Sequence, residues 1–357
     1  MVDQDLALFH DTAPLFSVNE FGAPMPDADR LWQAKSAAEW SPLFEQVHEL
    51  GGGYSSIRSG ARPLSLRDLF RHFIGDELSS LGIEMTPLQM RLVLHPLQTM
   101  VHQYSQLFTC LPDNIGTTGK TSNTAAAAAS SRAEELQSLL QRWSKLADHY
   151  LQSRPLCPVM QSNLIFFHLI SLNAVTNFPE IEKLARRENF DGTYQALVWS
   201  HKRCITNVKL ATFHSGQVLR VVRGMAKCVR PPWWAGAVYR AALVLWCDSL
   251  INKEEPSSAS TSPTTSRSPV LSHKQQQQQQ QQPQQFAIDA LPSDHPAVSR
   301  YLSKGEGVPC LSKRNGGTVS LDHGLTVLGH CIEVLDEGAS SRFSDGVRGK
   351  LDRLMRS

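Results

Sequence analysis

Thirteen histidines and seven cysteines are the side chains with the greatest potential for chemistry in this 357-residue sequence. A serine hydrolase of the α/β type carries its nucleophile in a Gly-x-Ser-x-Gly turn between a strand and a helix, and no such motif occurs here. His95 and His168 fall within apolar stretches, where a histidine is more often a core residue than a ligand. We therefore predict no catalytic residue and no enzymatic activity.

The cysteines do not form a metal-binding pattern. No Cys-x-x-Cys pair occurs, and such pairs supply the ligands of many structural zinc sites. Their odd number and wide spacing indicate reduced thiols, which we expect to be mostly buried. Asp294 and His295 precede Pro296 and are expected to form a turn instead of a metal site. We predict no metal and no other cofactor in this chain. The cysteines are Cys110, Cys157, Cys204, Cys228, Cys247, Cys310 and Cys331.

A concentration of basic residues is the candidate binding feature of the sequence. The net charge is only +2, so no strong overall field draws the chain onto nucleic acid or a membrane surface. Two predicted helices, about 194–210 and 217–229, nevertheless carry several cations. They are either ordinary solvated helix faces or a surface that contacts DNA phosphates or an acidic partner. The candidate residues are Lys202, Arg203, Lys209, Arg220, Arg223, Lys227 and Arg230, with His201 beside them.

The helix expected at the centre of the fold is the apolar run before Pro179. Residues 163–177 leave hardly any polar face, and a helix that is apolar all round is typically buried. Phe178-Pro179 breaks the pattern, because the residue before proline is pushed out of the α region and proline suits the first turn of a new helix. The next residues, 180–188, carry acids first and bases later, which favours a second, amphipathic helix.

Helical periodicity extends through most of the remaining chain. Thr86-Pro87 predicts a helix that runs to about Cys110 with Pro96 inside it, and 125–150 predicts a long amphipathic helix. Leu31 and Trp32 are expected to pack a first short helix. The predicted fold is all-α, an irregular array of about ten helices around the central buried helix, with a small helical tail.

A change of composition divides the chain. Residues 253–285 are rich in Ser, Thr and Pro and include eight consecutive glutamines, Gln275 to Gln282. Such a segment buries too little apolar surface to offset its conformational entropy, which predicts a disordered insertion. We expect residues 286–357 to form a C-terminal helical segment that packs on the same domain as residues 1–252.

No apolar run predicts a membrane span. The most apolar late segment, 235–251, contains Arg240 and Asp248, and charges are rare within spans. The absence of a signal peptide, together with the cysteine pattern, favours a soluble cytosolic or nuclear protein.

Several short motifs resemble a known family. The N-terminal motifs are Pro24-Met25-Pro26, Leu31-Trp32-Gln33-Ala34 and Ser36-Ala37-Ala38-Glu39-Trp40. They are similar to a passage of the fungal-specific transcription factor domain, or middle homology region, of C2H2-type zinc-finger regulators. The run 169–173, the turn 178–182 and the C-terminal tail share this similarity, which extends from about Pro24 to Met355.

The resemblance implies a non-catalytic transcription regulator in the nucleus, for example of a metabolic or secondary-metabolite gene cluster. It implies transcriptional machinery or co-regulators as partners, a homodimer, no membrane, and DNA contact only through zinc fingers that these residues do not contain. Zinc is then expected only in those fingers. Residues 1–252 are expected to be the C-terminal part of the family domain. Either the gene product is truncated, or the gene model is, or the protein regulates without contacting DNA itself.

Two alternatives stay open at this point. An interaction scaffold without a DNA-linked function predicts an exposed apolar groove. A hydrolase-type enzyme predicts a polar pocket where His, Asp and Ser side chains converge. The glutamines are likewise either a neutral spacer or a low-complexity contact for transcriptional machinery.

Overall fold

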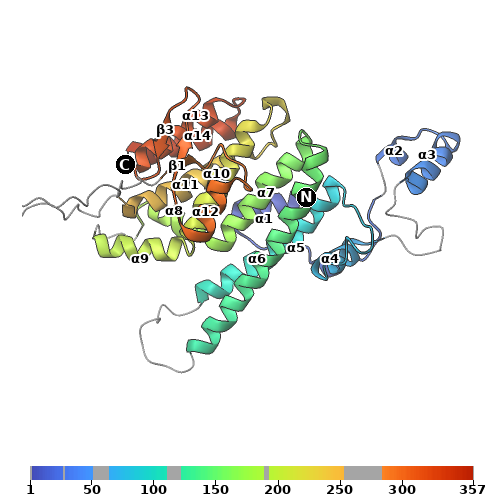
Figure 1. The fold of residues 1–357 in the computed structure, drawn as a ribbon, viewed down its shortest axis with the longest axis horizontal. Coiled ribbons are helices and arrows are strands. Elements are labelled where there is room, and N and C mark those ends of the chain that lie inside the picture. The colour runs from blue at the N-terminus through green and yellow to red at the C-terminus, as the bar shows by residue number, and fades with distance from the viewer. Residues whose placement is uncertain are drawn as a thin grey trace, which may run out of the picture. The chain divides into compact units, whose positions relative to one another are not determined.

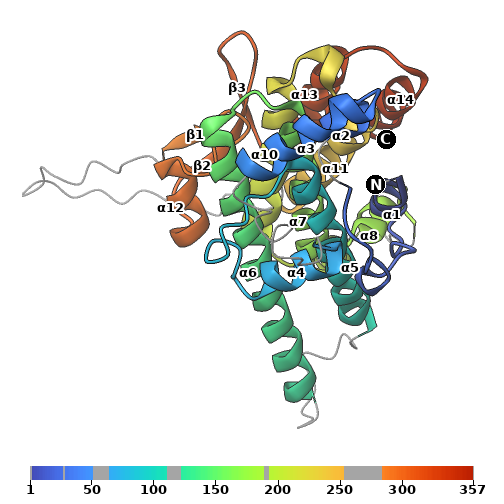
Figure 2. The same cartoon turned by 90° about the vertical axis from the view of Figure 1, so that its right-hand side faces the viewer.

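The computed structural model describes residues 2–26, 29–50, 64–110, 122–188, 193–252 and 284–356. These residues are mostly helical (70%) and form 14 α-helices and a small three-stranded sheet (Figures 1 and 2). The chain divides into two compact units, Met1–Ala174 with Val229–Pro231, and Val175–Cys228 with Pro232–Ser357.

The regular secondary structure described in the first unit is helical, apart from an isolated bridge between Pro24 and Ser65. Its elements are α1 (Val2–His10), the 3-10 helix η1 (Val18–Glu20), α2 (Asp29–Gln33), α3 (Ala37–Leu50), α4 (Leu66–Ile74), α5 (Pro87–Cys110), α6 (Ser122–Ser153) and α7 (Pro158–Val175). The predicted helix from Pro87 to Cys110 is confirmed, with Pro96 inside it. The predicted long helix is also confirmed and is a few residues longer at each end.

Helices α5, α6 and α7 are joined at Trp143. The indole of Trp143, in α6, is fully buried and stacks on Phe167 of α7 with ring centroids 4.9 Å apart. Its Nε1 donates a hydrogen bond to the carbonyl of Met90 in α5 (3.0 Å). The predicted burial of α7 is confirmed, because Ile165 and Leu169 are also fully buried.

Helix α1 is held on α5 by charged side chains. Arg91, only 3% exposed, forms an ion pair with Asp5, and its guanidinium lies 3.3 Å from the ring centroid of Phe166. The Nε2 atom of His95 lies 3.5 Å from Oδ2 of Asp3. His95 is buried, as predicted, and burial lowers its pKa. The pairing of Arg91 with Asp5 compensates a charge that is costly to bury alone.

The prediction that Trp32 packs the first short helix is wrong. Trp32 is 73% exposed, whereas Leu31 is 6% exposed. Helix α2 has only five residues and contacts α3, so it buries one narrow face, which Leu31 occupies. In α3, Trp40 stacks on Phe44 with centroids 4.7 Å apart.

The second unit combines helices with the sheet. Its elements are α8 (Phe178–Ala185), α9 (Tyr194–Cys204), α10 (Val208–Gly224), the 3-10 helix η2 (Lys227–Val229), α11 (Trp234–Asn252), β1 (Gln285–Ala287), α12 (Pro296–Lys304), β2 (Val308–Ser312), β3 (Thr318–Ser320), α13 (Gly324–Asp336) and α14 (Arg342–Arg356). The end of η2 belongs to the first unit.

Helix α11 is the core of the second unit and contacts α8, α9, α10, α13 and α14. The 18-residue stretch Trp234–Ile251 is long and apolar enough to cross a membrane by length and composition, but 78% of it is buried inside the protein. Burial against other helices accounts for its apolar character without a bilayer. The sequence indicated a helix here but placed the centre of the fold only at α7.

The sheet corrects the all-α prediction. Strand β1 pairs in parallel with β2, and β2 pairs antiparallel with β3, with Phe286 opposite Pro309 and Leu311 opposite Val319. Strands of three to five residues present too few alternations to produce a clear pattern in the sequence. The predicted insertion, 253–285, lies outside the described residues up to position 283, and Gln285 already begins β1.

Candidate functional site

The predicted basic residues separate into exposed and internally bonded groups. Lys202 and Arg203, in the last turn of α9, and Lys209, in the first turn of α10, are exposed within 8 residues of one another. Lys227, in η2, is also exposed. His201 is buried beside Asp248 of α11, with Nε2 3.3 Å from Oδ1. Lys202, Arg203 and Lys209 therefore gather at the junction of α9 and α10, whereas Lys227 lies beyond the other end of α10.

Arg223 and Arg220 point into hydrogen-bond networks of their own unit. An Nη1 of Arg223 lies 2.7 Å from Oδ2 of Asp289 and 2.9 Å from both the carbonyl and the hydroxyl oxygen of Ser312. Nε of Arg220 donates to Oε1 of Gln217 (2.7 Å). Arg230 is half-buried and belongs to the first unit.

A buried polar cluster around Asp289 was not anticipated from the sequence. The Asp289 side chain is 0% exposed, accepts from the backbone N–H and the hydroxyl of Ser312 (2.7 and 3.1 Å), and lies 3.6 Å from Nε2 of His330. The Asp289 charge contributes to raising the pKa values of Cys310 and Cys331, for which burial is the larger cause. The serine donates to the aspartate rather than to the histidine, which is not the geometry of an activated nucleophile. The cluster joins α10, β2 and α13.

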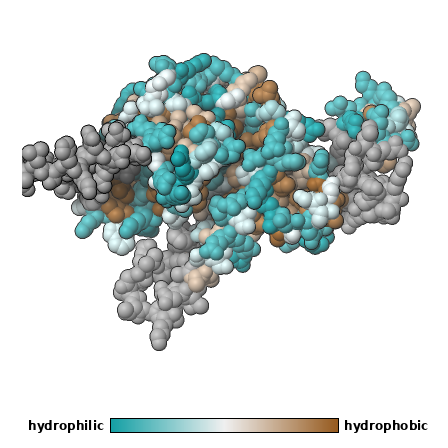
Figure 3. Space-filling model, in the orientation of Figure 1, coloured by the Kyte–Doolittle hydropathy of each residue, from teal (hydrophilic) through white to brown (hydrophobic). Residues whose placement is uncertain are grey.

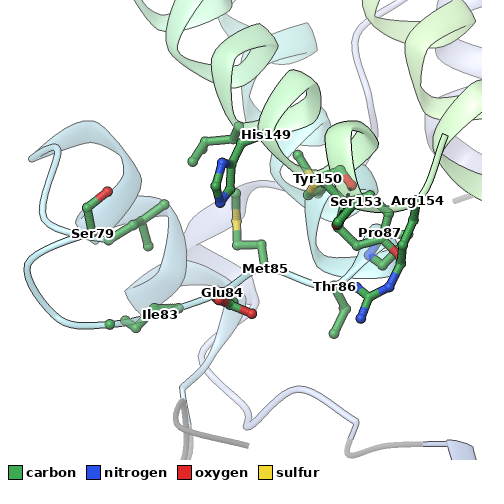
Figure 4. A pocket seen from close by; sticks show the side chains of 14 residues that line it. Ser79, Ile83, Glu84, Met85, Thr86, Pro87, His149, Tyr150, Ser153 and Arg154 are labelled. Carbon is green, nitrogen blue, oxygen red and sulfur yellow. Dashed lines mark hydrogen bonds between the residues drawn. The ribbon is translucent and has the colours of Figure 1, made fainter.

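The first unit contains an open pocket of about 580 Å³ between the segment 78–90 and the end of α6 (Figure 4). Met85 and Met90 supply apolar lining, and Glu84, His149 and Arg154 supply charged or titratable groups. The guanidinium of Arg154 lies 5.2 Å from the ring centroid of Tyr150. This volume is in the range of small-molecule sites.

The pocket does not assemble a nucleophile with a base. The hydroxyl of Ser153 donates to the carbonyl of Tyr150 (3.0 Å), a local helix contact that leaves His149 uninvolved. A serine becomes a nucleophile when a base accepts its proton. Within the described ranges, no three His, Cys, Asp or Glu side chains come together to hold a metal ion.

His295 has a structural role. It is the N-cap of α12, and its Nδ1 accepts from the N–H of Ala297 (3.2 Å). The peptide N–H of His295 donates to the carbonyl of Pro292 (3.1 Å), which closes the turn expected before Pro296.

On the face that Figure 3 shows, hydrophilic residues alternate with smaller hydrophobic patches.

Comparison with known proteins shows that the chain is homologous over its whole length to fungal transcription factors. A transcription factor of Zymoseptoria tritici is 58% identical over 369 residues, which cover 100% of this chain and 36% of that protein. Transcription factor 1 of Elsinoe fawcettii is 53% identical, with 100% of this chain and 35% of that protein covered. Transcription factor PfmaH of Pestalotiopsis fici is 35% identical, with 99% of this chain and 34% of that protein covered.

The chain thus spans about a third of the length of these curated relatives. No family model matches the chain, and no solved structure matches it significantly. The homologues are transcription factors and not enzymes.

Proposed function

We propose that this chain is the regulatory, non-catalytic middle region of a fungal transcription factor. The observation that supports this proposal is the homology of the whole chain to several fungal transcription factors, of which it covers about a third. The remaining two thirds of such a protein leave room for a separate DNA-binding part. The mostly helical fold with surface cations suits a platform for other proteins.

The finer assignment follows the motifs at Pro24-Met25-Pro26 and Trp40. We propose that the region corresponds to the fungal-specific transcription factor domain of C2H2-type regulators, and that DNA is contacted through zinc fingers outside this chain. Zinc is then held only in those fingers. The protein acts in the nucleus, on a metabolic or secondary-metabolite gene cluster, with transcriptional co-regulators and a second copy of itself as partners.

A reporter assay tests the regulatory role. The chain is fused to a bacterial DNA-binding domain, and transcription from a promoter with the matching operator is measured in a fungal host. We expect reporter output to differ from that of the DNA-binding domain alone. Equal output, with equal amounts of both proteins, contradicts the proposal and favours a scaffold without a DNA-linked function.

The exposed cations at the junction of α9 and α10 are proposed to contact an acidic partner. The test variant reverses Lys202, Arg203 and Lys209 to Glu, since a rim charge acts mainly on association with an oppositely charged surface. The matched control reverses three other exposed cations of the same unit, Arg300, Lys313 and Arg314. A loss of reporter regulation in the first variant alone supports the contact, and equal behaviour of the two variants contradicts it.

The role of the glutamines is tested by deletion. Gln275 to Gln282 lie outside the described residues. We propose that they act as a spacer, so that the fusion lacking them regulates the reporter as the full chain does. Reduced output from the deletion indicates a contact with transcriptional machinery instead.

A further inference from the structure

A second pocket lies within the second unit, where α8, α11 and α14 meet. Its volume is about 410 Å³, within the range of small-ligand sites. Tyr239 and Leu243 of α11 and Leu354 of α14 form apolar parts of its lining. The pocket belongs to one compact unit and includes none of the predicted basic residues.

Glu182, the acidic residue of this pocket, is paired with two neighbouring side chains. Oε2 of Glu182 lies 2.6 Å from Nη2 of Arg186, and Oε1 accepts from the hydroxyl of Tyr239 (3.2 Å). Burial and the neighbouring Glu182 charge raise the pKa of Tyr239, so the phenol is a neutral donor at physiological pH. These contacts hold the Glu182 carboxylate at the wall of the pocket and compensate its charge.

Two cations of the same pocket have no such compensation. Lys350 and Arg353 lie three residues apart on α14, so they project from one face of the helix. The Nζ of Lys350 lies 5.2 Å from the ring centroid of Tyr239. Neither side chain forms an ion pair with a carboxylate in the part of the chain that the structure describes. The pocket therefore has one compensated acid and an excess of positive charge beside apolar walls.

We propose that this pocket binds a small amphipathic carboxylate, with the carboxylate between Lys350 and Arg353 and its apolar body against Tyr239 and Leu243. The charge excess selects an anion over a neutral ligand. The apolar walls select a ligand with a hydrocarbon body over a bare anion.

Calorimetric titration of the full chain with three probes tests this site. Octanoate carries both features, octanol lacks the charge, and acetate lacks the hydrocarbon body. We expect octanoate to bind about five- to tenfold more tightly than octanol, because two exposed cations each contribute modestly. We expect it to bind at least about tenfold more tightly than acetate, because methylenes leave water on binding. Equal binding of octanoate and either comparator, or no binding of octanoate, overturns the proposal.

Variants assign the binding to the pocket. In the double variant Lys350→Gln/Arg353→Gln, octanoate and octanol are expected to bind with about equal affinity, because both exposed charges are removed. The matched control is Arg314→Gln/Arg342→Gln, which removes two exposed cations that do not line the pocket and is expected to keep the preference. Ala185→Trp keeps every charge but fills the pocket from the end of α8, and is expected to weaken octanoate binding. Unchanged binding in Ala185→Trp, with its helical circular dichroism retained, overturns the proposal.

Discussion

The guanidinium of Arg223 lies 2.7 Å from the carboxylate of Asp289, a residue 66 positions later in the sequence whose side chain is fully buried. The pair joins α10 to the chain that follows residue 283. Arg223 therefore has a structural explanation, although its sequence neighbours suggested a binding surface.

Removing Arg223 is expected to destabilise the protein strongly. Arg223→Met leaves the buried Asp289 carboxylate without its cation, which costs about 3–5 kcal/mol in comparable buried pairs. Urea denaturation measures the change in the free energy of unfolding. Lys227→Met removes an exposed cation shortly after the same helix and should change that free energy by less than about 0.5 kcal/mol. Similar stabilities of the two variants would contradict the structural role.

A methyl group at Gly216 is expected to separate α10 from the segment after β1. A Cβ built at this position lies 2.7 Å from Cγ2 and 3.0 Å from the backbone oxygen of Ile288. Gly216→Ala should therefore lower the free energy of unfolding by about 1–3 kcal/mol, as overpacking usually does.

Gly224 provides the matched glycine at the end of the same helix. A Cβ at Gly224 meets nothing within 4 Å. Gly224→Ala is expected to leave stability equal or raise it by up to about 1 kcal/mol, because alanine loses less backbone freedom on folding. Thermal denaturation of both variants checks the contrast, and destabilisation of Gly224→Ala alone would contradict it.

Trp143 is expected to be essential to the first unit. Trp143→Ala removes its contact with Phe167 and its hydrogen bond to Met90, and truncations of this kind cost about 3–5 kcal/mol. Trp199→Ala removes a tryptophan that is 62% exposed and should cost less than about 0.5 kcal/mol. Denaturant midpoints followed by circular dichroism distinguish them. Comparable midpoints would show that Trp143 does not join the three helices.

The free energy of unfolding is expected to decrease as the pH is lowered, because His214 is buried in its neutral form. Complete burial lowers the pKa of His214 to about 3, whereas the unfolded chain has the ordinary value of 6.5. Between these values the unfolded state binds a proton that the folded state does not, so stability is lost as pH falls below 6.5 toward 3. The loss approaches about 1.4 kcal/mol per pH unit for this group.

Comparison with a variant isolates that contribution. His214→Gln removes the titration, so its free energy of unfolding should depend less steeply on pH than that of the natural chain between pH 7 and 4.5. Urea denaturation at several pH values measures both slopes. Parallel slopes would contradict the burial of a neutral His214.

The long helices were predictable because their signals are local. The apolar run of α7 and the spacing of buried residues in α6 span several turns, and Pro87 marks the start of α5. The pairing of short extended segments into a sheet was missed because the strands are short and pair across intervening residues. The Asp289 cluster was missed because its members, Arg223, Ser312 and His330, are brought together only by tertiary packing.

Two segments of the second unit, one ending at Asn252 and the other beginning at Gln284, are held together by the ion pair of Asp289 and the close approach at Gly216. These contacts are noncovalent and join residues that lie before position 253 to residues that lie after position 283. We therefore expect the two segments to stay associated after proteolytic cleavage between those two positions.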